Sequence, residues 1–308
     1  MKEIKGTLIL LLAAFIWGMS FVAQSTASGI VEPFTYNGVR LIIGALFLTG
    51  FLLLRKAVKA PNLIEQEQTN IISKKKAIIS GTICGIVLFF AVNLQQIGIE
   101  NYPSGVATSG RSAFLTATYV IMVAVVSCIK SKKIQLFVIL AVFVCMAGMF
   151  LLCFSDGISG VYFADLLGFL CAVCFTMHIL VIDKFFSIDS IVLSCVQFYV
   201  SGILSLICMV IFESPNINAI LLMWLPILYS GIMSSGIAYT LQIVGQKYSK
   251  PATASIVMSL ESVFAALGGW MILSEKLTFL QFLGCALVFV AVILAQLPQF
   301  KKNKNENC

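Results

Sequence analysis

Apolar residues recur along the chain in ten long runs of about 18 to 25 residues each, divided by short polar segments. A run of this length suffices for an α-helix to cross a hydrocarbon layer about 30 Å thick. The runs lie at residues 7–26, 34–54, 77–98, 104–127, 134–154, 165–183, 190–212, 220–244, 252–273 and 278–297. The pattern therefore predicts an all-α integral membrane protein with ten transmembrane helices.

The composition agrees with a membrane environment. Of the 308 residues, 60% are hydrophobic and only 11% are charged, whereas about a quarter of the residues in a soluble domain are charged. A chain with so few charges cannot cover a globule of this size with polar surface. We therefore expect membrane lipid to be its solvent.

The first run has a second interpretation, as a secretory signal peptide. Lys2 and Lys5 precede an apolar stretch that ends in Ser25-Thr26-Ala27, which loosely resembles a cleavage site. Cleavage would leave nine runs and would remove half of the internal pairing described below. We therefore favour a membrane span.

The net charge of +7 is distributed unevenly. If the N-terminus is cytoplasmic, nearly all basic residues fall in cytoplasmic segments: Lys2, Lys5, Arg55, Lys56, Lys59, Lys74, Lys75, Lys76, Lys130, Lys132, Lys133, Lys184, Lys247, Lys250, Lys301, Lys302 and Lys304. The opposite side has only Lys276, and Arg40 and Arg111 lie inside runs. The positive-inside rule then predicts a multi-pass protein of the cell membrane with both termini in the cytoplasm. This distribution argues against nucleic acid as a partner.

The ten cysteines do not form a metal-binding pattern. Nearly all of them lie in apolar runs, where cysteine packs as a small apolar residue. Cys171 and Cys174 form one C-x-x-C pair, but no second pair exists and the chain has one histidine. We expect no metal and no cofactor.

The two halves of the chain resemble each other. Leu94-Gln95 in the third run matches Leu241-Gln242 in the eighth, and Ala107-Thr108 matches Ala254-Ser255 at the same offset. Each half contains five runs, an odd number, so the second half must enter the membrane from the opposite side. The sequence thus predicts two inverted five-helix repeats, residues 1–155 and 156–308, a plan typical of secondary transporters.

Three stretches have the character of family motifs: FIWGMSF at residues 15–21, the Glu-Pro-Phe start of residues 32–45, and residues 260–278. In their order and together they resemble the EamA-type, ten-helix branch of the drug/metabolite transporter superfamily. The resemblance implies a central cavity with alternating access between the halves. It also places Arg40 in a helix outside the cavity lining, where a structural clamp is favoured over a ligand.

Proline positions qualify this resemblance. The family usually has proline where this chain has Ser262, and the fourth run has no proline either, so a kinked ninth helix is in doubt. Pro226, by contrast, lies inside the eighth run and predicts a kink there.

Several ionisable residues fall at membrane depth, where each needs a partner or an aqueous cavity. Arg111 and Thr108 belong to a polar stripe at helical spacing in the fourth run, which favours cavity lining over an interhelical ion pair. Glu261 is a candidate for an ion pair with Arg40 or Arg111, for a proton site, or for the cavity edge. His178 is a candidate for a hydrogen-bonded helix contact or a proton site.

Neutral polar and aromatic residues complete the candidate site. Gln95 and Gln242 occupy equivalent places in the two halves, which favours a substrate role over packing between helices. Tyr239 shares a helix face with Gln242, and Trp17 is a candidate either for packing in the core or for the wall of the cavity.

These residues favour a transporter over a catalyst, because the runs contain no nucleophile–base pair and no carboxylate pair. Arg40, Arg111 and Glu261 together give the membrane interior a surplus of positive charge, which favours carboxylate or zwitterionic solutes. We predict a secondary transporter, an exporter of small metabolites such as amino acids. A nucleotide-sugar or drug carrier of the same fold, an intramembrane enzyme and a receptor are the alternatives, and proton coupling, facilitated diffusion and the oligomeric state stay open.

Overall fold

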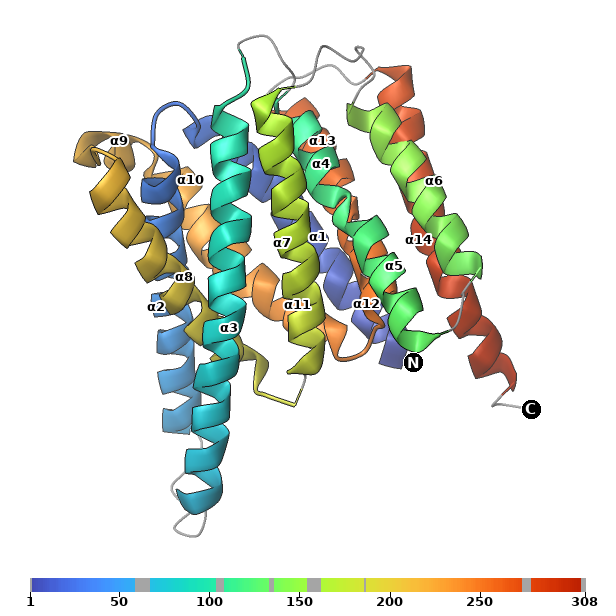
Figure 1. The fold of residues 1–308 in the computed structure, drawn as a ribbon, viewed down its shortest axis with the longest axis horizontal. Coiled ribbons are helices and arrows are strands. Elements are labelled where there is room, and N and C mark those ends of the chain that lie inside the picture. Colours follow the sequence, from blue (N-terminus) through green and yellow to red (C-terminus); the bar gives the residue numbers. More distant parts are fainter. Residues whose placement is uncertain are drawn as a thin grey trace.

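The computed structural model describes residues 2–58, 67–103, 108–132, 136–153, 162–185, 187–272 and 278–305, and every regular element in these ranges is a helix (Figure 1). The helices are α1 (Lys2–Ala27), α2 (Pro33–Val58), α3 (Glu67–Glu100), α4 (Thr108–Ala117), α5 (Tyr119–Ser131), α6 (Leu136–Cys153), α7 (Phe163–Lys184), α8 (Ser190–Phe212), α9 (Ile217–Leu222), α10 (Trp224–Tyr229), the π-helix η1 (Ser230–Ala238), α11 (Tyr239–Gln246), α12 (Pro251–Met258), α13 (Leu260–Ile272) and α14 (Phe279–Asn305).

Most of these helices have the length and composition of membrane spans. Seven helical segments are long and apolar enough to cross a membrane, and three shorter apolar helices cover Leu115–Ser131, Leu136–Leu151 and Phe279–Ala295. Large apolar side chains such as Phe143 and Val210 are exposed on the outside of the bundle, as lipid requires. The predicted class, an all-helical multi-pass membrane protein, is confirmed.

Three of the expected spans are not continuous α-helices. The fourth run is divided into α4 and α5 at Thr118, and the ninth into α12 and α13 at Ser259. The eighth run begins later than expected, after a turn at Met223, and changes to a π-helix in its middle. The predicted kink at Pro226 is therefore misplaced: Pro226 lies in the first turn of α10, where a missing N–H costs little.

The bundle is held together by long helix pairs, most of them antiparallel (Figure 1). The most extensive contacts join α6 to α14 and α2 to α8, and α3 packs on both α7 and α8. Small residues let these backbones approach closely: a Cβ added at Gly148 of α6 would lie only 2.7 Å from the carbonyl oxygen of Gly284 in α14. This is the usual way for helices to pack in lipid, where no hydrophobic effect drives them together.

One end of the α2–α8 pair is fixed by an aspartate. Asp189 caps the N-terminus of α8, accepting hydrogen bonds from the N–H groups of Ile191 at 3.0 Å and Val192 at 3.2 Å. The same carboxylate binds Arg55 near the end of α2, with Nη1 and Oδ2 2.8 Å apart. Asp189 thus stabilises α8 and attaches it to α2.

The other end of this pair is fixed by two glutamates. Glu213, which follows α8, accepts hydrogen bonds at 2.7 Å from the N–H groups of Phe34 and Thr35 in the first turn of α2. Glu32, which precedes α2, accepts a 3.1 Å hydrogen bond from the N–H of Ser214. A carboxylate at a helix N-terminus is favoured by the helix dipole, so both ends of the pair are closed by charge-assisted hydrogen bonds.

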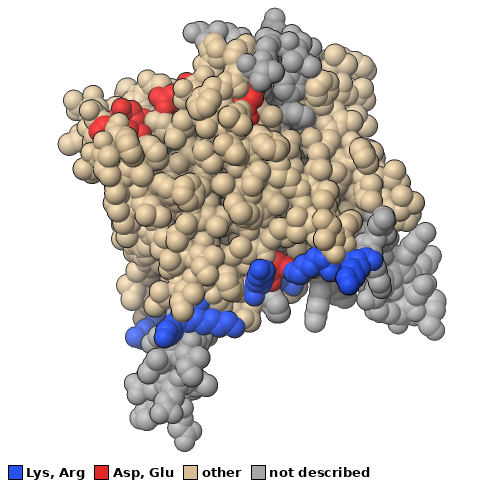
Figure 2. Space-filling view, in the orientation of Figure 1, with Lys and Arg blue, Asp and Glu red and all other residues tan. Residues whose placement is uncertain are grey.

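Charged side chains divide the bundle into two faces. Figure 2 shows basic side chains along the lower edge and acidic side chains gathered along the upper edge. The lower edge is the side on which α1 begins and α14 ends, and α2 ends there as well (Figure 1). The charge difference lies along the helix axes, as expected for a bundle that spans a membrane with one basic side.

We expect Asp189→Ala to lower the melting temperature of the detergent-solubilised protein, because α8 loses a cap worth about 1 kcal/mol along with the Arg55 ion pair. Asp189→Asn keeps a capping side chain and loses only the charge, so its effect should be smaller. Lys56→Ala, an exposed change on the neighbouring residue of α2, is the control and should leave the melting temperature unchanged.

The same residue predicts a pH dependence. Burial tends to raise the pKa of Asp189, but hydrogen bonds from Arg55 and from the N–H groups of Val192 and Ile191 outweigh burial and hold the pKa below its ordinary value. A depressed folded-state pKa stabilises above the unfolded pKa, and this stabilisation is lost as the pH falls through the folded value. The melting-temperature difference between the wild type and Asp189→Asn should be full at neutral pH and disappear in acid. A difference that persists unchanged in acid would contradict this account.

Candidate functional site

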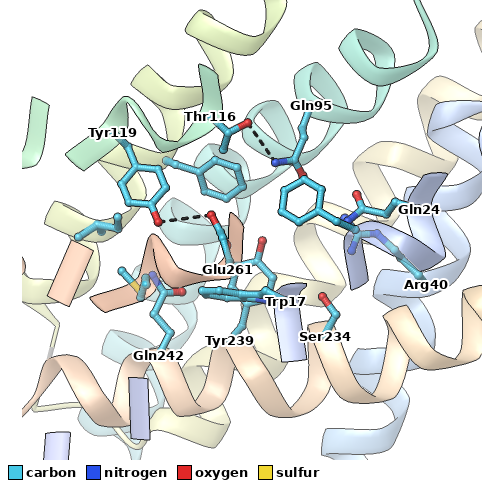
Figure 3. Close-up of a pocket in the computed structure, with 14 residues that line it drawn as sticks. Trp17, Gln24, Arg40, Gln95, Thr116, Tyr119, Ser234, Tyr239, Gln242 and Glu261 are labelled. Atoms are coloured by element: carbon cyan, nitrogen blue, oxygen red, sulfur yellow. Dashed lines mark hydrogen bonds between the residues drawn. The ribbon is translucent and has the colours of Figure 1, made fainter. Parts of the chain in front are cut away.

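A small cavity lies among the middle segments of the helices, and we refer to it as the central cavity (Figure 3). Its volume is about 40 Å³, which is room for about three water molecules. Its walls come from ten helical segments of both halves of the chain. The lining residues are Trp17, Phe21, Gln24, Arg40, Gln95, Thr116, Tyr119, Phe175, Ile179, Ser234, Tyr239, Gln242, Met258 and Glu261.

The two interrupted helices meet this cavity at their breaks. At the first break the hydroxyl of Thr118 donates to the carbonyl oxygen of Leu115 at 2.6 Å, and at the second Ser259 donates to Ile256 at 2.7 Å. Such bonds from a serine or threonine to its own helix compete with the helical ladder and bend it. The absence of proline made an interrupted ninth helix doubtful. The structure corrects this expectation, because a hydroxyl residue lies at the break.

Arg40 is held at the cavity by a chain of amide hydrogen bonds. Its Nε donates to Oδ1 of Asn37 at 2.8 Å, and Nδ2 of Asn37 donates to Oδ1 of Asn93 at 3.0 Å. Asn93 in turn donates to the hydroxyl of Ser205 on α8 at 2.9 Å. The two terminal nitrogens of Arg40 form no hydrogen bond or ion pair with any described residue, and the side chain is only 2% exposed. The chain of amides thus orients a cation whose outer donors are free.

The expected position of Arg40 therefore needs correction. The sequence places this residue outside the cavity as a structural clamp, whereas the structure places it in the lining. Both features coexist, because Nε of the guanidinium binds Asn37 and its Cζ lies 5.6 Å from the centroid of the Tyr36 ring, while its terminal nitrogens form no hydrogen bond or ion pair with a described residue. α2 brings Arg40 to the cavity by packing closely on η1 and α8.

Glu261 supplies the opposite charge. It lies in the first turn of α13, immediately after the break, and is 7% exposed. Its only hydrogen bond among the described residues is a long one, 3.4 Å, from the hydroxyl of Tyr119. No ion pair joins it to Arg40, and the two lie well apart in Figure 3. The cavity thus has a basic and an acidic side chain that form no ion pair with each other.

Aromatic rings form the wall between these charges. The rings of Trp17 and Tyr239 meet edge to face with their centroids 4.8 Å apart, and Tyr239 packs in the same way on Phe198 of α8 at 5.6 Å.

Two glutamines of the lining have an acceptor without a partner. The side-chain oxygens of Gln24 and Gln242 accept no hydrogen bond from any described residue. Buried polar atoms are normally paired, so these two oxygens are unpartnered acceptors on residues that line the cavity.

His178 lies behind the cavity wall instead of in it. Its side chain is fully buried, its Nε2 lies 3.1 Å from Oε1 of Gln197, and its ring meets the ring of Tyr239 with centroids 6.0 Å apart. His178 therefore touches the lining residue Tyr239 but is not itself a lining residue. This contact corresponds to the hydrogen-bonded helix contact considered for it from the sequence.

The structure brings together many of the candidate residues. Trp17, Gln95, Tyr239, Gln242 and Glu261 line one cavity. Thr108 and Arg111 lie in helix α4, but their side chains fall outside those that the structure describes.

Several residues that line the cavity were not predicted from the sequence. Phe21 and Gln24 follow Trp17 at helical spacing on α1, a signal that could have found them. No comparable signal pointed to Thr116 or Tyr119, because the break at Thr118 changes which face of the helix they share. Thr116 accepts a 3.3 Å hydrogen bond from Gln95.

Comparisons with known proteins agree with this arrangement. The profile of the EamA-like transporter family matches residues 4–154 and 162–297. A protein of Archaeoglobus fulgidus named as an uncharacterized transporter is 27% identical over 96% of this chain and 87% of its own length. The uncharacterized transporter YoaV of Bacillus subtilis is 23% identical over 94% of this chain and 96% of its own. A solved crystal structure shares the fold with a TM-score of 0.74 and 18% identity, covering 95% of this chain and 96% of that one.

The contact of α1 with α13 gives a test of the cavity wall. A Cβ added at Gly18 would overlap the Cβ of Phe264 and lie 2.9 Å from the carbonyl oxygen of Glu261. We expect Gly18→Ala to destabilise the protein by about 1–3 kcal/mol through overpacking, lowering the melting temperature in detergent. The matched control is Gly50→Ala on α2, where the added carbon meets nothing within 4 Å. Equal effects of the two changes would show that α1 and α13 are not in close contact.

Proposed function

Because the chain belongs to the EamA-like transporter family, we propose that it is a secondary transporter that exports small zwitterionic metabolites, such as amino acids, across the cytoplasmic membrane. The observation that carries this proposal is that a guanidinium and a carboxyl group line the central cavity without an ion pair between them. Arg40 and Glu261 are both at least nine-tenths buried, and neither has an ionic partner among the described residues. Burying a charge without a partner is costly, so a ligand that satisfies both charges would gain substantial binding energy.

A zwitterion matches this arrangement at both of its ends. Its carboxylate would bind the free terminal nitrogens of Arg40, whose planar fork suits a carboxylate. Its ammonium group would bind the carboxylate of Glu261 and the free side-chain oxygen of Gln242. Trp17 and Tyr239 would contact an apolar side chain, because their rings form the wall between the two charges. A simple cation lacks the group that Arg40 requires.

We further propose that the chain crosses the membrane ten times and that its two halves are inverted repeats of five helices each. Seven long apolar helices and three shorter ones supply ten spans. The contacts between helices are related in pairs, as a twofold exchange of residues 1–155 and 156–308 would require. α1 packs on α12 and α13 as α7 packs on α4 and α5, and α1 packs on α11 as α7 packs on α3. The pairs α2–α8 and α6–α14 each join equivalent spans. This pattern supports the inverted repeat independently of the sequence matches.

The remaining features of the proposal concern orientation and motion. The basic lower face would be cytoplasmic by the positive-inside rule, with both termini on it. A cavity of about 40 Å³ is too small for an amino acid, so transport requires the helices to separate, in turn, on each side. Coupling to protons through Glu261 or His178 and facilitated diffusion are both compatible with this cycle.

Counterflow in proteoliposomes tests the substrate class and its binding groups. Labelled leucine should exchange and a labelled quaternary ammonium ion should not. Arg40→Gln should lower leucine exchange at low concentration by about tenfold or more, because a hydrogen bond to a charged group contributes about 1.5–3 kcal/mol. Glu261→Gln should have a similar effect, and Arg40→Lys an intermediate one.

The control for this test is Lys56→Gln, which removes an exposed charge from α2 far from the cavity and should leave exchange within about twofold of the wild type. All variants should elute as the wild type does in gel filtration. Exchange of the quaternary ammonium ion with no exchange of amino acids would contradict the proposal and favour a carrier of cationic drugs.

A further inference from the structure

A second, larger cavity lies between the central cavity and the basic face, and we refer to it as the inner cavity. Its volume is about 340 Å³, within the range of pockets that hold small molecules. It is bounded by α5, α6, α7 and the start of α12. The transport scheme above does not use it.

The two cavities share three of their walls. On α5 the central cavity is lined by Tyr119 and the inner cavity by Ala124, and on α12 by Met258 and Thr253 respectively. The two residues of each pair are five positions apart in the sequence. At a rise of about 1.5 Å per residue, the cavities lie about 7–8 Å apart along these helices. On α7 the inner cavity is lined by Leu180, which directly follows Ile179 of the central cavity, and by Asp183 about one turn further on.

The barrier between the cavities is thin and apolar. It consists of the side chains that lie between these pairs on α5 and α12, including Val120, Val123, Ile256 and Val257, all of them fully buried in one hydrophobic cluster. The four named side chains have no polar atoms, and the hydroxyl of Ser255, also in this layer, donates to the carbonyl oxygen of Ala252 in its own helix at 2.8 Å, so separating the helices breaks only packing. Such a layer can open and close without leaving a buried polar group unpaired.

The mouth of the inner cavity carries charges of both signs. Nζ of Lys130 at the end of α5 lies 3.6 Å from Oδ2 of Asp183 on α7, and Lys250 stands at the start of α12. The Lys130 side chain is 65% exposed, and an exposed pair of this kind contributes little stability. An incoming ammonium group can therefore replace Lys130 beside Asp183 at small cost.

We propose that the inner cavity is the cytoplasmic loading site of the transport path. A zwitterionic solute binds there first, its ammonium group at Asp183 and its carboxylate at Lys250, before the valine and isoleucine layer opens toward the central cavity. This inference rests on the proposed function for its substrate class and orientation. The aqueous nature of the cavity and its place on one side of the membrane can be tested without any substrate.

The first experiment measures the accessibility of single cysteines in a variant whose ten native cysteines are replaced. Ala124 lines the inner cavity but is only 5% exposed. Its neighbour Val125 is 51% exposed and does not line the cavity. A membrane-impermeant maleimide should label Ala124→Cys from the cytoplasmic face at least tenfold faster than Val125→Cys. Equal labelling of the two, no labelling of Ala124→Cys, or labelling only from the outer face would overturn the proposal.

The second experiment uses the native thiol of Cys128, which also lines the inner cavity, as the only cysteine. Leucine should slow its alkylation, and leucine methyl ester, which lacks the carboxylate, should not. Asp183→Asn and Lys250→Gln should each raise the leucine concentration for half protection at least threefold. Lys132→Gln, at the same end of α5 but outside the lining, is the control.

These outcomes separate the two proposals. If Cys128 is protected by none of the common amino acids while one of them exchanges in counterflow, the loading site is wrong and the proposed function stands. If no amino acid exchanges but Ala124→Cys is labelled from the cytoplasmic face, the inner cavity is an aqueous entrance and the substrate class is wrong.

Discussion

Lipid offers no hydrogen bonds, and this constraint shapes the whole molecule. Every backbone group must be paired inside the chain, which leaves helices as the only elements among the described residues. On the face shown in Figure 2 the charged side chains lie at the two ends of the bundle, and Arg40 and Glu261 are buried inside it. A charge that stays inside must have a reason to be there. Arg40 and Glu261 are buried and form no ion pair with each other, and this makes the central cavity the candidate functional site.

The surrounding structure divides into a fixed part and a part able to move. α2 and α8 are joined at one end by Asp189 and Arg55 and at the other by Glu213 and Glu32. In the middle, the amides that orient Arg40 extend from α2 through α3 to Ser205 of α8. The helices on the other side of the cavity, α5 and α12, face each other mainly through apolar side chains. Motion that opens a path is therefore expected on the side of α5 and α12, where only packing has to be broken.

The hydrophobic pattern predicts the helices well because lipid imposes length and apolarity on each span separately. It predicts helix breaks poorly, since these depend on hydroxyl groups such as Ser259 that bond to their own backbone, and serine is equally common in unbroken helices. The residues of the site were partly predictable. Trp17, Gln242 and Glu261 are unusual for a membrane span and could be singled out, whereas the place of Arg40 in the lining depends on how α2 packs against η1, which is a tertiary fact. His178 is equally unusual for a membrane span, but its ring packs behind Tyr239 and does not line the cavity.

The central claim is that one cavity recognises a carboxylate and an ammonium group at the same time. Isothermal titration of the purified wild-type protein with leucine, leucine methyl ester and N-acetylleucine tests it directly, because each derivative removes one of the two charges and keeps the side chain. The account predicts that leucine binds and that each derivative binds at least tenfold more weakly, a difference of about 1.4 kcal/mol or more. Binding of the methyl ester as tight as that of leucine would contradict the role of Arg40, and with it the claim that the cavity is built for a zwitterion.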